Sequence, residues 1–203
     1  MIHRIANLSK TNSFFLFGAR GVGKTSLIAE RFTPEESLVI NLLLPSEFNR
    51  FLRDPEELLN ICKALSVEKK WVILDEIQKV PALLDVVHQL IETTTLRFVL
   101  TGSSSRKLKR GGGNLLAGRA FVFELFPFTS QELGDAFNLR EVLQWGALPM
   151  IFKPGISNED RELYLKAYTQ TYLKEEIQEE QLVRNLRSFY LFLDIAAQMN
   201  GKF

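Results

Sequence analysis

Five short apolar segments recur along the first 128 residues of the chain, and helical patterns separate most of them. These segments lie at residues 13–17, 37–44, 71–75, 97–101 and 120–126. Apolar runs of this length, bounded by polar residues, predict buried β-strands. Because strands alternate with helices here, the pattern predicts an α/β fold in which a parallel sheet carries helices on both faces.

Two of the segments between the strands carry apolar residues at helical spacing. The first stripe is Leu58, Leu59, Ile61, Cys62 and Leu65, and the second is Leu83, Leu84, Val87, Leu90 and Ile91. Stripes with this period predict amphipathic helices that bury one face against the sheet. Cys62, the single cysteine of the chain, is therefore expected to be a small apolar core residue.

The pattern changes after Phe128. Helical segments of mixed polarity follow at residues 131–137, 141–145 and 159–199, and no further strand is predicted. We therefore expect an α/β core at residues 1–128 and a mainly helical part at residues 129–203. The last helical stretch has few apolar partners in the chain, so we expect the helical part to include the start of a truncated further domain.

Composition narrows the class of protein without indicating a partner. The 203 residues are 46% hydrophobic, which is enough for a substantial core. Lys and Arg number 25 against 24 Asp and Glu, so the overall charge gives no argument for nucleic acid or a membrane as a partner. No signal peptide starts the chain, no apolar run approaches the roughly 18 residues that span a bilayer, and a lone cysteine fits a reducing compartment. We therefore expect a cytoplasmic protein.

A glycine-rich loop links the first predicted strand to the first predicted helix. Its residues 18–25 read GARGVGKT and match the pattern G-x-x-x-x-G-K-S/T of phosphate-binding loops. Glycines let such a loop wrap tightly and aim its N–H groups at phosphate oxygens. Lys24 is then expected to reach the β- and γ-phosphates of a nucleotide, and the Thr25 hydroxyl to ligate Mg²⁺. The expected nucleotide-binding residues are Gly18, Ala19, Arg20, Gly21, Val22, Gly23, Lys24, Thr25 and Ser26.

Two adjacent carboxylates, Asp75 and Glu76, end the third predicted strand. A buried strand delivers Asp75 to the crevice at the carboxyl end of a parallel sheet, where it can support Mg²⁺. Because side chains alternate along a strand, Glu76 points elsewhere, and we expect it to be the general base for a water that attacks the γ-phosphate. Small-molecule kinases are the main alternative, but the carboxylate pair favours water as the acceptor.

Small hydroxyl residues end the fourth predicted strand. If that strand lies between the first and the third, Thr101 or Ser103 would be within reach of the γ-phosphate or of the attacking water. Such a hydroxyl could sense whether the γ-phosphate is present. The alternative is a purely local role in the turn, where hydroxyl residues are common.

Basic residues surround the next turn. Four cations precede the glycines of residues 111–113, namely Arg106, Lys107, Lys109 and Arg110. A solvated loop, a switch that faces phosphate or another subunit, and a nucleic-acid contact are all open interpretations, although no aromatic residue in the run supports base stacking. Arg119, just before the fifth predicted strand, could stabilise transition-state charge in cis or across a subunit boundary, or could be a surface arginine.

Taken in order, these motifs resemble a prokaryotic AAA+-type P-loop ATPase family that pairs an N-terminal ATPase domain with a C-terminal domain of unknown function. The matching segments are residues 18–26, 71–81, 98–108, 116–133 and 145–149, and Ala19 and Gly21 depart mildly from the family's usual loop. The resemblance implies the P-loop NTPase sheet order 5-1-4-3-2, ATP and Mg²⁺ as ligands, and a helical lid or winged-helix-like segment after Phe128. It also implies that residues 172–177 begin the C-terminal domain.

Three functions remain open from the sequence. The first is an ATPase, with the expected catalytic residues Glu76, Lys24, Thr101, Ser103 and Arg119. The second is a nucleotide-gated regulatory switch with little turnover, whose partner is an unknown protein or a second copy of the chain. The third is an ATPase stimulated by nucleic acid through the basic run. Adenine is the expected base, because no Asn-Lys-x-Asp pattern that reads guanine is present.

Overall fold

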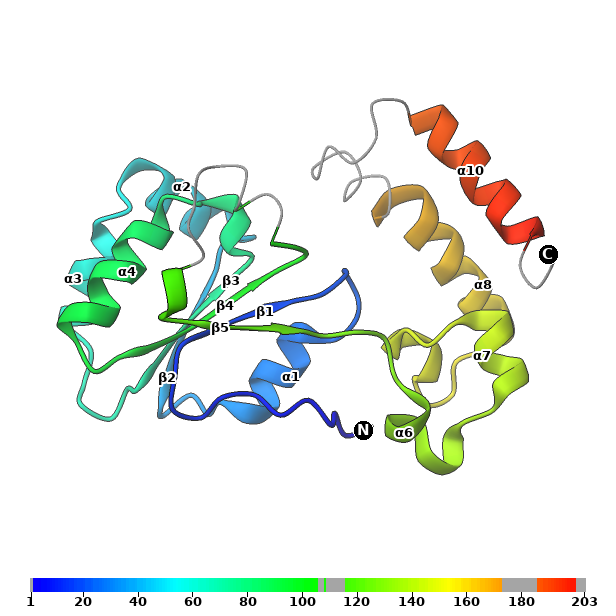
Figure 1. The fold of residues 1–203 in the computed structure, drawn as a ribbon, viewed down its shortest axis with the longest axis horizontal. Helices are drawn as coiled ribbons and strands as arrows, with labels where there is room; N and C mark the ends of the chain where they lie inside the picture. Colours follow the sequence, from blue (N-terminus) through cyan, green and yellow to red (C-terminus); the bar gives the residue numbers. More distant parts are fainter. Residues whose placement is uncertain (1, 106–107, 109–115, 173–185, 200–203) are drawn as a thin grey trace. The chain divides into compact units, whose positions relative to one another are not determined.

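The computed structural model describes residues 2–105, 108, 116–172 and 186–199 of the chain (Figure 1). The chain forms two compact units, Met1–Ile156 and Ser157–Phe203. The first unit therefore contains the α/β part together with the helical segment that directly follows it. Among the described residues, none of the helices combines the length and the hydropathy that a membrane span requires.

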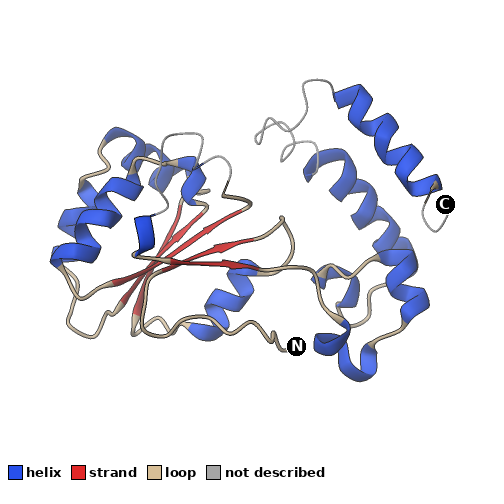
Figure 2. Ribbon diagram, viewed as in Figure 1, coloured by secondary structure: helices blue, strands red, loops and turns tan. Residues whose placement is uncertain are grey.

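A five-stranded parallel sheet forms the centre of the first unit (Figure 2). Its strands are β1 (Phe14–Phe17), β2 (Ser37–Asn41), β3 (Trp71–Asp75), β4 (Arg97–Gly102) and β5 (Phe121–Glu124). Neighbouring strands follow the order β2-β3-β4-β1-β5, and every pair is parallel. Read from the other edge, this is the order 5-1-4-3-2, so the predicted α/β fold and its strand order are confirmed.

The second strand is shorter than the apolar run that predicts it, because the chain turns at Asn41. The Asn41 side-chain oxygen accepts a hydrogen bond from the Leu43 N–H at 2.9 Å, and its carbonyl accepts one from the Leu44 N–H at 3.1 Å. Pro45 then begins α2 (Pro45–Arg53), a position where its missing N–H and fixed φ are tolerated.

Helix α1 (Lys24–Arg31) covers one face of the sheet (Figure 1). Its buried residues Leu27 and Ile28 belong to the same apolar cluster as Phe14 and Leu16 of β1. The alternate β1 residues point to the other face, as the pleat of a strand requires. This packing fixes the start of α1 at the carboxyl end of β1, where the glycine-rich loop joins the two.

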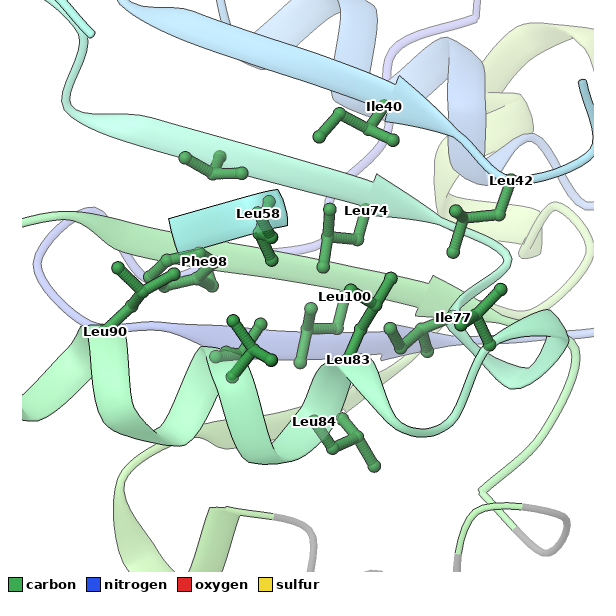
Figure 3. Close-up of a cluster of buried hydrophobic side chains, with 14 of the residues drawn as sticks. Ile40, Leu42, Leu58, Leu74, Ile77, Leu83, Leu84, Leu90, Phe98 and Leu100 are labelled. Atoms are coloured by element: carbon green, nitrogen blue, oxygen red, sulfur yellow. The ribbon is translucent and has the colours of Figure 1, made fainter. Parts of the chain in front are cut away.

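Helices α2, α3 (Glu57–Lys63) and α4 (Leu83–Thr93) cover the opposite face. Leu74 and Leu100 of the sheet lie with Leu58 of α3 and Leu83 of α4 in one buried cluster (Figure 3). Each fully buried side chain of this size contributes about 1.5–3 kcal/mol relative to exposure. The cluster therefore holds β3 and β4 firmly. The residues at the ends of these strands are held in place by the same packing.

Cys62 is buried in α3 and belongs to the same cluster, as the helical stripe predicts. Burial raises the pKa of its thiol to about 11. The thiol is therefore protonated at neutral pH, and a protonated buried thiol is a packing residue rather than a nucleophile.

The described residues after Phe128 contain helices and no strand. The first unit continues with α6 (Ser130–Leu133), α7 (Leu139–Trp145) and two short 3-10 helices, η3 (Gly134–Ala136) and η4 (Pro149–Phe152). The second unit contains α8 (Asn158–Ala167), the π-helical turn η5 (Tyr168–Tyr172) and α10 (Leu186–Gln198). Helix starts follow from side-chain caps, because Thr129, Asn138 and Ser157 each accept a backbone N–H of the first turn. Residues 173–177, part of the expected entrance to a further domain, lie outside the described residues.

Candidate nucleotide-binding site

The glycine-rich loop lies between the end of β1 and the start of α1. Gly21 and Gly23 have φ angles of 80° and 96°, in the left-handed region that favours glycine. Gly18 lies so close to the Leu125 carbonyl oxygen that a Cβ there would clash with it. The tight turn and the close approach both require glycine, which is the physical reason for this part of the motif.

Lys24 lies over the loop that it follows. Its side chain is only 7% exposed, and Nζ donates hydrogen bonds to the carbonyl oxygens of Gly18 at 2.6 Å and Ala19 at 3.3 Å. The ammonium group is thus held at the mouth of the loop by two neutral acceptors. Hydrogen bonds to an anionic phosphate are stronger than these, so a bound phosphate can replace the carbonyl oxygens as the acceptor.

Asp75 connects three elements at the carboxyl end of the sheet. Its carboxylate, which is 7% exposed, accepts a hydrogen bond from the Thr25 hydroxyl at 3.4 Å and a second one from the Thr101 hydroxyl. The Thr25 and Asp75 oxygens are hard ligands of the kind that Mg²⁺ prefers. The two residues expected to hold the metal are therefore together, directly behind the phosphate-binding loop.

Thr101 is fully buried, and its hydroxyl is already engaged. It donates to Asp75 and accepts the Glu76 backbone N–H at 3.1 Å. β4 does lie between β1 and β3, as the interpretation of Thr101 requires. In this structure the hydroxyl therefore contacts Asp75 and Glu76, and its expected role near the γ-phosphate stays a prediction.

Glu76 turns the chain out of β3. Its φ and ψ angles of 63° and 48° are left-handed, which is uncommon for a residue with a side chain and typically costs about 1–3 kcal/mol. Backbone strain of this kind clusters at functional sites. The Glu76 carboxylate accepts a hydrogen bond from the side-chain amide of Gln78 in the short helix η1 (Ile77–Lys79).

Ser103 lies beside the loop, whereas Arg119 does not. Ser103 lines a cavity of about 340 Å³ together with Gly18 and Ala19. Arg119 precedes β5, which runs parallel to β1, so it lies at the opposite end of the sheet from the glycine-rich loop. There it forms an ion pair with Glu92 at 2.5 Å. In this arrangement Arg119 is therefore not brought together with Lys24, Asp75 and Glu76.

The basic run at residues 106–110 lies outside the described residues except for Leu108, which is buried in the apolar cluster under α4. The interpretations of this run as a solvated loop, a switch or a nucleic-acid contact stay untested.

A second cavity, of about 650 Å³, adjoins the other side of the loop. Among its lining residues are Arg4, Val22, Gly23, Phe128, Met150 and Phe152. The cavity is mainly apolar and borders the phosphate-binding loop directly, and both properties suit the flat ring of a nucleoside base. Sequence reasoning gave no signal for it, because its walls come from the N-terminal segment, α1 and residues 128–154.

Arg4 holds the N-terminal segment against the segment that follows β5. Its guanidinium donates to the Phe126 carbonyl oxygen, lies 4.8 Å from the centre of the Phe128 ring and pairs with Glu132 at 3.3 Å. The two charged side chains are only 7% and 3% exposed. Burial lowers the pKa of the guanidinium, and the Glu132 carboxylate acts in the opposite direction. Arg4, held in this way, is one of the residues that line the larger cavity.

Replacing Glu132 by Gln is expected to lower the free energy of unfolding by about 3 kcal/mol, because removal of one partner leaves a buried charge uncompensated. Urea unfolding monitored by tryptophan fluorescence measures the change. Glu92→Gln, which opens the exposed pair with Arg119, is the matched control and is expected to have little effect. Equal unfolding midpoints for the two variants would contradict the importance of the buried pair.

The sheet order, the phosphate-binding loop after β1 and the carboxylate pair after β3 together define a nucleotide-binding protein of the P-loop ATPase type. Comparison with known families agrees. The model described as "AAA domain" matches residues 10–134, which is more than half of the chain. The chain belongs to the AAA domain family.

A protein of known sequence and a solved structure are also similar to the chain. An uncharacterized protein of Methanocaldococcus jannaschii is 28% identical over 188 residues, which cover 88% of this chain and 37% of that protein. The chain thus spans little more than a third of that relative's length. Among solved structures, the Aeropyrum pernix ORC1 protein in complex with DNA matches with a TM-score of 0.43 and 16% identity, over 92% of this chain and 60% of the other. Neither similarity assigns a substrate or a partner to this chain.

Proposed function

We propose that the chain binds ATP with Mg²⁺ and hydrolyses it to ADP and phosphate at the carboxyl ends of β1, β3 and β4. The observation that carries this proposal is the convergence on Asp75, which accepts hydrogen bonds from Thr25 after the loop and from Thr101 at the end of β4. A metal-supporting carboxylate, a hydroxyl ligand and a phosphate-binding loop are thereby within one site. The carboxylate of Glu76, the next residue in the chain, makes a different contact, because it accepts a hydrogen bond from Gln78.

The loop and Lys24 hold the phosphates. A glycine-rich turn of this kind can aim backbone N–H groups at phosphate oxygens. Lys24 exchanges its two carbonyl acceptors for the β- and γ-phosphate oxygens. Thr25 and Asp75 are the residues that would hold Mg²⁺, which when bound neutralises charge on the β- and γ-phosphates.

Glu76 activates the water. Its carboxylate accepts a proton from the water oxygen while that oxygen attacks the γ-phosphorus, and the bond to the β-phosphate oxygen breaks on the opposite side. Asp75 is assigned to the metal instead, because its two oxygens accept hydrogen bonds from Thr25, the other proposed metal ligand, and from Thr101. These contacts support the proposed division of roles between the two carboxylates.

The larger cavity is proposed to hold the adenine base. Its position beside Val22 and Gly23 places a base next to the phosphate-binding loop.

Phe152→Ala is expected to weaken ATP binding about tenfold, since aromatic contacts with a base contribute about 1–3 kcal/mol. Binding of inorganic triphosphate should not change, because it does not reach the cavity. Calorimetric titration measures both ligands, and an equal loss for ATP and triphosphate would contradict a base site here.

The proposed function as a whole is tested by calorimetric titration with ATP and GTP in Mg²⁺ or EDTA, combined with an assay of phosphate release. The expected result is binding of ATP in preference to GTP and phosphate release that stops in EDTA. Absence of ATP binding, or phosphate release that is indifferent to EDTA, would contradict it.

A further inference from the structure

We propose that Gln78 is a positioning residue that holds the Glu76 carboxylate in place, and that Gly102 at the end of β4 leaves the space that Gln78 needs to do so. The inference rests on the proposed function of Glu76 as general base. It assigns roles to two residues that do not touch the nucleotide.

Gln78 is a polar residue in a buried environment, next to an apolar core residue. It is only 3% exposed, in the turn η1 that follows Glu76, and its neighbour Ile77 is fully buried. Its side-chain amide nitrogen donates a hydrogen bond to Glu76 Oε2. A carboxylate can only accept hydrogen bonds, so the nitrogen of the amide must face Glu76 and the oxygen must face away.

The other end of the amide has no polar partner. Among the described residues, Gln78 Oε1 is buried and accepts no hydrogen bond. A buried carbonyl oxygen without a donor is unfavourable, and a side chain free to choose would turn it to water or a donor. The orientation is therefore held by the hydrogen bond to the charged carboxylate and by the walls around the amide.

Gly102 forms one of those walls. A Cβ at this position would lie 2.5 Å from Gln78 Oε1 and 3.4 Å from its carbonyl carbon, with the Phe17 ring 3.6 Å away on another side. Because 3.6 Å is an ordinary van der Waals distance and 2.5 Å is a clash, the atoms that must give way are those of Gln78. Any side chain at residue 102 therefore pushes the amide, and the amide is what holds Glu76.

The same stretch of β4 also contacts Asp75, the Glu76 backbone and the phosphate-binding loop. The hydroxyl of Thr101 bonds to Asp75 and to the Glu76 N–H, and the Gly102 carbonyl accepts a hydrogen bond from the Gly18 N–H at 3.3 Å. The end of β4 thus contacts the phosphate-binding loop directly through Gly102. It affects the Glu76 carboxylate indirectly, because Gly102 lies against Gln78 and Gln78 is hydrogen-bonded to Glu76. A structural residue that only filled the core would not need this particular orientation of its amide.

The kinetic test uses Gln78→Met, which keeps the length of the side chain and removes its donor. Outer hydrogen bonds that orient metal ligands typically account for about 10- to 100-fold in metal affinity or activity, and we expect a similar factor for a hydrogen bond that orients the general base. We expect kcat for ATP to fall by about that factor while the Kd for ATP changes less than about twofold. Gln89→Met, at an exposed position on α4, is the matched control and should keep the wild-type rate. A wild-type kcat in Gln78→Met, or an equal loss of kcat and binding, would overturn the proposal.

Gly102→Ala tests the second half of the proposal through a double-mutant cycle. Alone, it should lower kcat by a factor similar to that of Gln78→Met. Combined with Gln78→Met, it should add less than about a twofold change, because the amide through which it acts is already gone. Effects that multiply would show that Gly102 acts by another route and would overturn the link. Circular dichroism of each variant checks that the fold is kept.

A readout without turnover separates this inference from the proposed function. If wild type releases no phosphate, or Glu76→Gln releases it at the wild-type rate, the proposed function fails. The contact is then decided by ¹⁵N–¹H NMR of the Gln78 side-chain amide, identified as the signal missing from Gln78→Met. Signals that move in both Glu76→Ala and Gly102→Ala support the positioning contact, and unmoved signals overturn it.

Discussion

Replacing Lys24 by Ala is expected to weaken ATP binding by at least about a hundredfold. Lys24 Nζ lies at the mouth of the phosphate-binding loop, where it donates to the Gly18 and Ala19 carbonyl oxygens. Hydrogen bonds to charged groups contribute about 1.5–3 kcal/mol each, and Lys24 is expected to make more than one to the phosphates. Each 1.4 kcal/mol corresponds to about a tenfold change in affinity. Fluorescence anisotropy of a labelled ATP analogue measures the loss directly.

Lys63→Ala is the matched control for this experiment. Lys63 is exposed at the end of α3, on the face of the sheet away from α1, so its removal also deletes one positive charge without touching the site. Its affinity for ATP should equal that of the wild type. If Lys24→Ala bound ATP as well as Lys63→Ala does, the loop would not be the phosphate site.

Replacing Glu76 by Gln is expected to leave ATP binding nearly unchanged and to lower turnover by about 10²- to 10⁴-fold, the range typical of a lost general base. The substitution keeps the size of the side chain and its polarity. It removes the group that accepts a proton from water. Equilibrium binding and phosphate release, measured on the same preparation, separate the two effects.

Glu68→Gln serves as the control, because Glu68 is exposed in the turn before β3 and the substitution removes the same charge far from the loop. Wild-type turnover is expected there. A common loss of binding in Glu76→Gln and Lys24→Ala would contradict separate roles for the base and the phosphate ligand.

Much of this fold could be predicted because its signals are local in the sequence. Each strand is a short apolar run, and the helix stripes repeat at helical spacing. The meeting of Thr25 and Asp75 was also predictable, since both follow parallel strands and the carboxyl ends of such strands lie at one edge of the sheet. The strand order itself followed from the resemblance to a known family, because periodicity does not say which strands are neighbours.

Other features of the site depend on contacts between distant residues. Arg4 and Glu132 lie 128 positions apart in the numbering, and no pattern in either segment indicates that they meet. Arg119 precedes β5, and the parallel pairing of β5 with β1 places it at the amino end of the sheet, away from the glycine-rich loop.

The directions of the Thr101 and Gln78 side chains could not be predicted from the sequence. The sequence places a hydroxyl at the end of β4 and an amide after Glu76, but not the direction of either group. Both directions result from hydrogen bonds to the neighbouring carboxylates, the first to Asp75 and the second to Glu76. These two side-chain orientations are therefore set by hydrogen bonds that form only in the folded structure.

ATP hydrolysis with Glu76 as the base is the activity that we propose for this site. Its most direct test is a single-turnover assay in which wild type and Glu76→Gln are each saturated with γ-labelled ATP and Mg²⁺, so that both start with the same amount of bound substrate. We expect release of labelled phosphate from the wild type and almost none from the variant. Equal rates from the two proteins, or bound ATP that neither protein cleaves, would contradict it.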